Sequence, residues 1–291
     1  MIKFQRKIWM AVIIAVMLAV SGMTVLAQEE PEGDPARGGR LYVAWDLEIG
    51  ELTPFRNHTL WRETEKVETA SWRCVTCHGW VYKGRVVDDI EYPGLFSMVA
   101  DPQEEVIAWL DGSKNPDHNF SRVLSDEDLL DLSAFLISGL IEPDLIVDPE
   151  TLQAGGIMTV GEDLYKQACR TCHGADGARI NFGTASSPVF MGDLAEDNPW
   201  LAAHTIRNGH PGLKTPTAED FDWSFSLQID LLTYLQRLPR IRQIGKVEFD
   251  PIDYSDQAGT IELVYASIAM MVVVFGGVGF VLLRERISRN S

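Results

Sequence analysis

Two short segments of the chain repeat one pattern of reactive side chains. Residues 74–78 and 169–173 each read Cys-x-x-Cys-His, and they contain all four cysteines of the 291-residue chain. At this spacing two thiols can add to the two vinyl groups of one haem. The next residue, His78 or His173, can then bind the iron as its proximal ligand. We therefore expect two covalently bound haem c groups, attached through Cys74, Cys77, Cys169 and Cys172.

Other uses of paired cysteines explain the pattern less well. A zinc site built from both pairs would have to bring together segments that are far apart in the sequence. A redox-active Cys-x-x-Cys pair does not account for the histidine that follows both times. Two short-range disulfides do not account for it either, so haem attachment remains the favoured interpretation.

The N-terminus has the features of an export signal. Three basic residues (Lys3, Arg6 and Lys7) precede the apolar stretch 8–20, and Ala27 ends a small-residue cleavage pattern. We expect a signal peptide over residues 1–27, with an uncleaved anchor as the alternative. In both cases the following domain is carried across a membrane, where c-type haem is attached.

The C-terminus has the features of a membrane anchor. Residues 263–283 contain no charged side chain, and a helix of this length spans a hydrocarbon core of roughly 30 Å. A basic tail over residues 284–291 follows, with Arg284, Arg286 and Arg289. By the positive-inside rule this tail is cytoplasmic. The body of the protein, joined through a linker at 246–262, is then expected on the periplasmic or extracytoplasmic side.

The formal net charge of the chain is −17. Such an acidic chain is poorly suited to bind nucleic acid or an anionic lipid surface. It favours a basic soluble redox partner, which the field of the protein would attract. A charge that serves solubility alone is the alternative.

The region between the two ends contains a tandem repeat. Gly38-x-x-Leu41-Tyr42 matches Gly161-x-x-Leu164-Tyr165, and Pro93 and Pro188 each lie fifteen positions after the motif histidine. A Pro- and Gly-containing stretch at 141–156 separates the copies. We expect a first domain over residues 28–140, this linker, and a second domain over residues 157–245.

Each copy closes with a helical pattern. Ser125 is expected to cap the first helix, followed by an acidic first turn and an apolar face. Ser226 is expected to cap the second, which ends before Pro239.

This order of elements resembles the class I cytochrome c family: a helix, Cys-x-x-Cys-His, a proline-containing loop and a C-terminal helix. The resemblance implies an all-α fold of two tandem cytochrome c-like domains, to which the C-terminal transmembrane helix is added. It also implies that the carbonyls of Pro93 and Pro188 accept hydrogen bonds from Nδ1 of the proximal histidines. The first copy departs from the family by an aromatic-rich insertion before its motif, which we interpret as packing, with partner docking as the alternative.

The methionine that binds the far face of the iron in this family is missing from both copies. In the first copy His118 lies at its place, where it either binds the iron or forms hydrogen bonds in a surface loop. Met98 and Met191 lie close behind the two prolines and are expected to contact haem rather than bind iron. In the second copy His210, Lys214, His204 and Met191 are all candidates, and a five-coordinate iron is the remaining alternative.

Three functions are compatible with these features. We favour a membrane-anchored dihaem cytochrome that transfers electrons on the extracytoplasmic side, and a respiratory or substrate-oxidising complex is one setting in which it could serve as a subunit. An open or Lys/His-ligated second haem would instead suit a dihaem peroxidase or an oxidoreductase of sulfur or nitrogen compounds. A haem-based sensor ranks last, because the short cytoplasmic tail has no room for an output domain.

Overall fold

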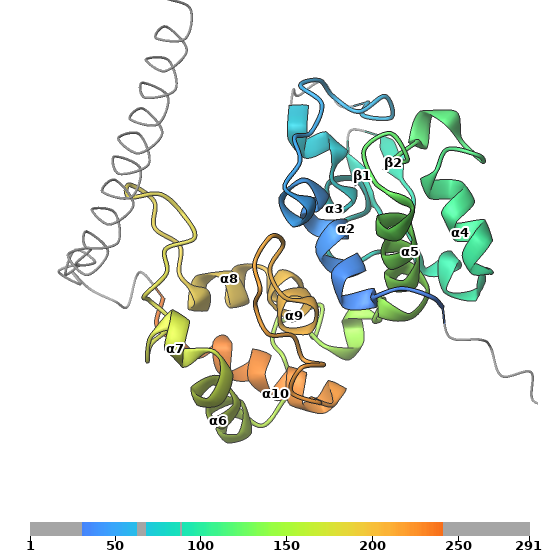
Figure 1. The fold of residues 1–291 in the computed structure, drawn as a ribbon. Helices are drawn as coiled ribbons and strands as arrows, with labels where there is room; N and C mark the ends of the chain where they lie inside the picture. The colour runs from blue at the N-terminus through green and yellow to red at the C-terminus, as the bar shows by residue number, and fades with distance from the viewer. Residues whose placement is uncertain (1–30, 63–67, 88, 241–291) are drawn as a thin grey trace, which may run out of the picture. The chain divides into compact units, whose positions relative to one another are not determined.

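The computed structural model describes residues 31–62, 68–87 and 89–240 (Figure 1). The expected signal peptide at 1–27, the linker at 246–262, the membrane span at 263–283 and the tail at 284–291 lie outside these residues. Within the described ranges, no helix has both the length and the apolar character that crossing a bilayer requires.

The described residues of the first half form four α-helices and one hairpin. The helices are α2 (Pro35–Ile49), α3 (Cys74–His78), α4 (Gln103–Leu110) and α5 (Asp126–Ala134), and the strands are β1 (Arg85–Val87) and β2 (Ile90–Tyr92). Single 3₁₀ turns lie at Glu68–Trp72, Phe96–Ala100 and Pro116–His118, and a π-helical turn at Phe135–Gly139 extends α5. The predicted, largely helical architecture is confirmed, but the hairpin was not expected.

The second half is helical throughout its described elements. These are α6 (Met158–Ala168), α7 (Arg170–His173), α8 (Met191–Asp197), α9 (Pro199–Asn208) and α10 (Phe225–Leu235), preceded by a 3₁₀ turn at Pro143–Leu145. Each half has its own apolar core, and each core extends to the first cysteine of its motif.

In the first half α2 and α5 cross at Gly38. A Cβ on this glycine would lie only 2.0 Å from the carbonyl oxygen of Asp131, so no larger residue fits while the helices remain this close. The Asp131 carboxylate accepts a hydrogen bond from the Asp34 backbone N–H at 2.7 Å and pairs with the Arg37 guanidinium. Ser125 caps α5 in a capping box, as predicted.

The second half repeats this crossing between α6 and α10. A Cβ on Gly161 would lie 2.0 Å from the carbonyl oxygen of Asp230, and the Asp230 carboxylate accepts from the Ile157 N–H at 2.6 Å. The prediction that Ser226 caps the last helix was wrong. The N-cap position is Ser224, and Ser226 lies in the first turn with its hydroxyl 3.0 Å from that of Ser224.

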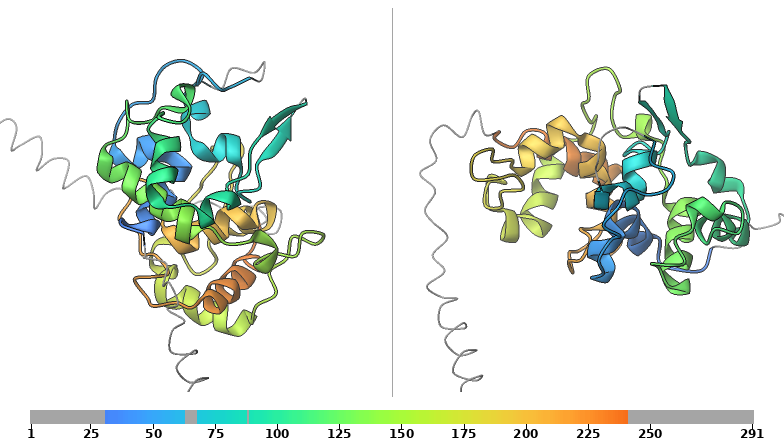
Figure 2. Two further views of the ribbon diagram at one scale, coloured as in Figure 1. Left: turned by 90° about the vertical axis from the view of Figure 1, so that its right-hand side faces the viewer. Right: turned by 90° about the horizontal axis from the view of Figure 1, so that it is seen from above.

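The hairpin extends away from the helices of the first half (Figure 2). Its register pairs Arg85 with Tyr92, and the turn contains Asp89 in the left-handed region (φ 62°). The Arg85 guanidinium lies over the rings of Tyr92 and Trp61, 5.0 and 5.5 Å from their centroids. These cation–π contacts attach the hairpin to the insertion.

The aromatic insertion belongs to the core of the first half. Trp45 and Trp72 are both buried. The Trp45 indole N–H donates to the Trp72 carbonyl at 2.8 Å, and the Trp72 indole N–H donates to the Arg56 carbonyl at 2.7 Å. The favoured interpretation, that the insertion packs onto its own domain, therefore agrees with the structure.

The segment expected as a linker, 141–156, packs against the second half. Val147 and Ala154 form a β-bridge with each other and are buried in the second core. The Gln236 side chain, from the turn after α10, accepts from the Ala154 N–H at 2.9 Å and donates to the Leu152 carbonyl at 2.7 Å. Much of this stretch is thus part of the domain that follows it.

Candidate haem sites

The first Cys-x-x-Cys-His segment lies on the wall of an apolar cavity of about 360 Å³. Cys74, Cys77 and His78 line it from α3, and His118 lines it from the loop before α5. The Tyr42 hydroxyl donates to the carbonyl of Gly79 at 2.6 Å and so fixes the end of α3 to α2. An apolar chamber with two thiols, His78 and a further imidazole, His118, on its walls fits a covalently attached haem.

His78 and His118 are each oriented by one backbone carbonyl. His78 Nδ1 lies 2.8 Å from the Pro93 oxygen, as the family resemblance implied, and His118 Nδ1 lies 2.9 Å from the Trp109 oxygen. These bonds leave Nε2 of both rings available to bind a metal. The ring centroids are 6.3 Å apart. An iron bonded to two imidazole nitrogens at about 2.0 Å each separates the ring centroids by about 6 Å, so the two rings could bind one iron together.

Burial keeps these groups in forms suited to haem binding. Desolvation lowers the pKa of His78 to about 4, and it also lowers the pKa of His118. Both rings are therefore neutral at pH 7, and the neutral imidazole is the form that binds a metal. Desolvation raises the pKa of the Cys74 thiol to about 12. Thioether formation would remove the cost of burying that polar group.

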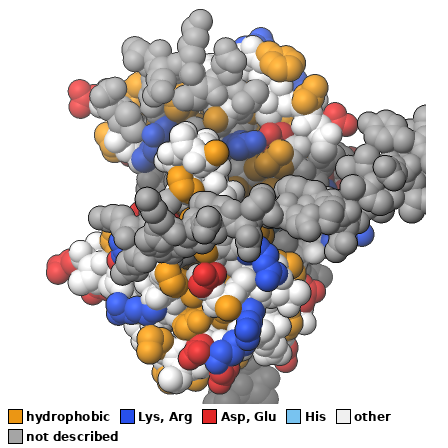
Figure 3. Space-filling model, turned by 90° about the vertical axis from the view of Figure 1, so that its left-hand side faces the viewer, with side chains coloured by type: hydrophobic (Ala, Val, Ile, Leu, Met, Phe, Trp, Pro, Cys, Tyr) orange, Lys and Arg blue, Asp and Glu red, His pale blue; other side chains and the backbone are white. Residues whose placement is uncertain are grey.

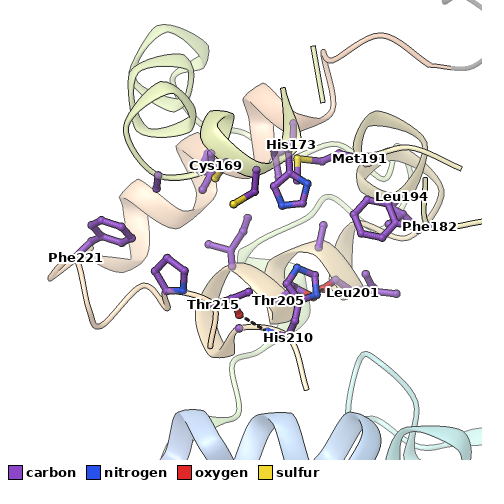
Figure 4. Close-up of a pocket in the computed structure, with 18 of the residues that line it drawn as sticks. Cys169, His173, Phe182, Met191, Leu194, Leu201, Thr205, His210, Thr215 and Phe221 are labelled. Carbon is purple, nitrogen blue, oxygen red and sulfur yellow. Dashed lines mark hydrogen bonds between the residues drawn. The ribbon is translucent and has the colours of Figure 1, made fainter. Parts of the chain in front are cut away.

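The second motif lines a separate cavity of about 150 Å³ (Figure 4). Cys169 lies on one side with His173, and His210 lies on the other. Cys172 also lines the cavity. The centroids of the two imidazoles are 6.5 Å apart. The His210 backbone N–H donates to the Thr215 hydroxyl at 2.8 Å, which closes the loop that carries this ring. Since each cysteine pair has its own cavity, the structure contradicts a zinc site shared between the pairs.

The expected hydrogen bond from His173 to the Pro188 carbonyl is not formed. His173 Nδ1 is buried and has no hydrogen-bond partner in the described part of the chain. Loop 181–189 instead closes on itself, with the Asn181 carboxamide oxygen accepting from the backbone N–H groups of Gly183 and Val189. The two prolines hold equivalent positions in the sequence, but only the Pro93 carbonyl orients its proximal ring.

The comparison with protein families bears on this second cavity. Residues 157–224 match the family described as cytochrome c oxidase, cbb3-type, subunit III. The match begins at the N-cap of α6 and ends at the N-cap of α10, so it includes both rings of the cavity. It supports a c-type cytochrome domain in the second half, with covalently bound haem c. No curated protein sequence matches the chain.

The remaining candidate ligands fall into two groups. Met98 lines the first cavity and Met191 the second, so each lies where it could contact a bound haem. Lys214 does not line the second cavity: it is exposed, and it borders an open groove beside α2. Of the residues weighed for the second iron, His210 and Met191 are therefore the two that the fold brings to His173.

His204 is not placed to bind iron. It is buried where the two halves meet, with Nδ1 2.6 Å from the Tyr82 hydroxyl and Nε2 3.0 Å from the Gly39 carbonyl oxygen. The rings of Tyr42 and Phe135 pack around it. Both ring nitrogens are used, so His204 joins the halves instead.

The first cavity contains a third imidazole to which the sequence analysis gave no role. His58, from the insertion, is buried and stacks on Phe120 at 5.4 Å. Its Nδ1 accepts from the Leu60 N–H at 3.2 Å, so the ring proton lies on Nε2. In the sequence, the signal for His58 is its position within the aromatic-rich insertion. This signal does not distinguish an iron ligand from a residue that packs.

Proposed function

We propose that this chain is a membrane-anchored electron carrier with two covalently bound haem c groups on the extracytoplasmic side. The observation that supports this most directly is the pair of imidazoles in each cavity, His78 with His118 at 6.3 Å and His173 with His210 at 6.5 Å between ring centroids. An iron with an imidazole on both faces has no open position for a substrate, which suits electron transfer rather than catalysis.

When bound, each haem supplies a reversible one-electron iron couple. The chain supplies attachment, orientation and a dry environment. The four motif cysteines anchor the two groups, and the Pro93 and Trp109 carbonyls orient the rings of the first site. The apolar cavity walls exclude water, which tunes the potential of an enclosed iron.

The placement at the membrane follows from the two ends of the sequence. Residues 1–27 would direct export, residues 263–283 would span the bilayer, and the basic tail from Arg284 would stay in the cytoplasm. Because residues 157–224 resemble a subunit of a cbb3-type cytochrome c oxidase, a respiratory complex is the favoured setting for this carrier.

The partner that exchanges electrons with this protein is proposed to be basic, because the net charge of the chain is −17. The acidic side chains do not form a uniform shell. On the face drawn in Figure 3, lysine and arginine side chains lie among acidic and hydrophobic ones. Attraction to a basic protein would therefore come from the field of the whole molecule rather than from this face.

Spectroscopy of the full-length protein, purified in detergent after expression with a haem-maturation system, tests the proposal. We expect a mass increase of two haems, near-infrared bands typical of bis-imidazole iron, and two reversible low-spin couples. Added cyanide should leave the ferric spectrum unchanged. A high-spin ferric component that binds cyanide and turns over peroxide would overturn the proposal in favour of a dihaem enzyme.

A further inference from the structure

Helix α9 has two different faces, and one of them borders the junction between the halves. One face contributes Leu201, Ala202, Thr205 and Ile206 to the second haem cavity. The other presents Trp200, Ala203, His204 and Arg207, spaced as one helical face, to the first half. The second set lines a cavity of about 30 Å³ that belongs to neither haem site.

This junction cavity is built by three parts of the chain. Trp80 and Tyr82 line it from the first half, Ile141 and Pro143 from the connecting segment, and α9 together with Phe225 and Gln228 of α10 from the second half. Among the described residues, no aspartate or glutamate lines it. A cavity needs about 10–15 Å³ of water-accessible volume to hold one water, so this cavity has room for a water or a small ion.

Trp200 brings an unused hydrogen-bond donor to the junction cavity. Its Nε1 atom is buried and has no partner among the residues that the structure describes. A buried indole N–H without an acceptor is costly, because it has lost its hydrogen bonds to water and gained none in return. A native fold normally supplies an acceptor to such a group, whether from the protein, from a water or from an ion.

Arg207 brings an unpaired positive charge to the same cavity. This arginine is partly buried, and within the described chain its guanidinium has neither an ion pair nor a hydrogen bond. Glu219 is near enough to favour the charged form, but it is exposed and forms no salt bridge with Arg207. A partly desolvated guanidinium without a counter-ion is unusual, because burying a charge is costly unless the charge is paired.

The other titratable groups of the cavity do not neutralise this charge. Desolvation raises the pKa of Tyr82 far above its usual value, so the phenol is neutral. Desolvation lowers the pKa of His204 to about 4, so this ring is neutral as well at pH 7. The cavity is thus lined by one residue with an unpaired guanidinium and by one with an unpartnered indole N–H.

We propose that the junction cavity binds a small monovalent anion of the size of chloride, held by the Arg207 guanidinium and the Trp200 indole N–H. Hydrogen bonds from a charged donor to an anion are stronger than those between neutral groups. The anion would satisfy both groups at once, and it would link α9 to the first half beside the Tyr82–His204 contact. The site is independent of the function proposed above.

An anion that binds the folded protein alone raises its stability by mass action. Thermal unfolding of the full-length holoprotein, followed by its circular dichroism, tests this at constant ionic strength. Replacing gluconate by chloride or bromide should raise Tm by about 2 °C or more. The increase should vanish in Arg207→Gln and shrink in Trp200→Phe. It should persist in Arg122→Gln, which removes an exposed arginine that lies outside the cavity.

Crystals grown in bromide provide a direct reading of the site. We expect an anomalous peak between the Arg207 guanidinium and Trp200 Nε1 in the wild type and in Arg122→Gln, and no peak in Arg207→Gln. Equal Tm values in halide and gluconate, or bromide crystals without this peak, would overturn the proposal. A haem carboxylate bound to Arg207 would also overturn it. In that case Arg207→Gln would shift a haem potential with no dependence on halide.

Discussion

The Tyr82 hydroxyl lies 2.6 Å from Nδ1 of His204 and joins the first half of the chain to helix α9 of the second. Both residues are buried. Tyr82 adopts a left-handed backbone conformation (φ 56°), which is uncommon for an aromatic residue. Nε2 of His204 continues the connection to the Gly39 carbonyl. A hydrogen-bonded chain through one imidazole therefore couples helices α2 and α9.

Tyr82→Phe is expected to destabilise the junction. Removing the hydroxyl leaves Nδ1 of His204 buried without a donor, at a cost of roughly 1–3 kcal/mol. Thermal unfolding of the holoprotein should show a decrease in Tm of several degrees. Tyr234→Phe is the matched control, because the Tyr234 hydroxyl forms no hydrogen bond with any described residue. Equal Tm values for the two variants would contradict a structural role of the Tyr82–His204 contact.

The stability of the fold should depend on pH through His204. Desolvation lowers its pKa to about 4, the Arg207 charge lowers it as well, and the bond to the Gly39 carbonyl raises it. The unfolded chain binds a proton at about pH 6.5, before the folded chain does. Stability is therefore full above about pH 6.5 and falls as the pH drops toward 4, by at most ~3 kcal/mol.

Chemical denaturation of the holoprotein between pH 7 and 4 measures this dependence. His204→Gln should flatten the curve over that interval. His58 also has a pKa lowered to about 4 by desolvation, so His58→Gln shows separately what that ring contributes. A wild-type slope that His204→Gln leaves intact would assign the dependence to other groups.

His118→Ala should open the first haem site. Its ring is the one that stands opposite His78 at 6.3 Å, so its loss leaves one face of the iron without an imidazole. Magnetic circular dichroism of the ferric protein should show half of the haem converted to high spin, and this half should now bind cyanide. His58→Ala is the control. It removes the third imidazole of the same cavity and is expected to leave the low-spin spectrum unchanged. A low-spin spectrum in His118→Ala would show that another residue binds the iron.

The sequence predicts what the motifs and the helix periodicity determine. The closing helices and the cap at Ser125 follow from local patterns, whereas the bond between His78 and Pro93 was implied by the family resemblance, and the structure agrees with all three. The predictions made from the sequence fail where contacts between distant segments determine the role of a residue. His204 has the residue type of a ligand, but only the fold shows that Tyr82 and Gly39 occupy both its nitrogens.

The choice of ligand at the second site was also beyond the sequence. His210 and Lys214 lie in the same loop, and either type of side chain can bind an iron. The turn closed by the Thr215 hydroxyl places His210 in the cavity and leaves Lys214 exposed. The hairpin β1–β2 was missed because strands of three residues are too short to show a period of two.

At the second site His210→Ala should produce the high-spin, cyanide-binding signal, and Met191→Ala should not. Both residues line the cavity with His173, but the His210 ring is the one with a centroid 6.5 Å from the proximal ring. Lys214→Ala is a control from the same loop and should leave the spectrum as in the wild type. If Met191→Ala alone gives the high-spin signal, methionine is the sixth ligand of this iron.

The equivalent glycines Gly38 and Gly161 should tolerate no substitution. A methyl group at either position would lie 2.0 Å from a carbonyl oxygen of the facing helix, so the helices must move apart, typically at a cost of 1–3 kcal/mol or more. Separation of α6 from α10 would also loosen the wall of the second haem cavity, since Leu231 and Leu235 line it from α10. We therefore expect Gly161→Ala to lower both Tm and haem content. Gly155→Ala is the matched control, because a Cβ at Gly155 meets no atom within 4 Å. If the two variants unfold at the same temperature and retain the same haem content, Gly161 is not required for the close approach of α6 and α10.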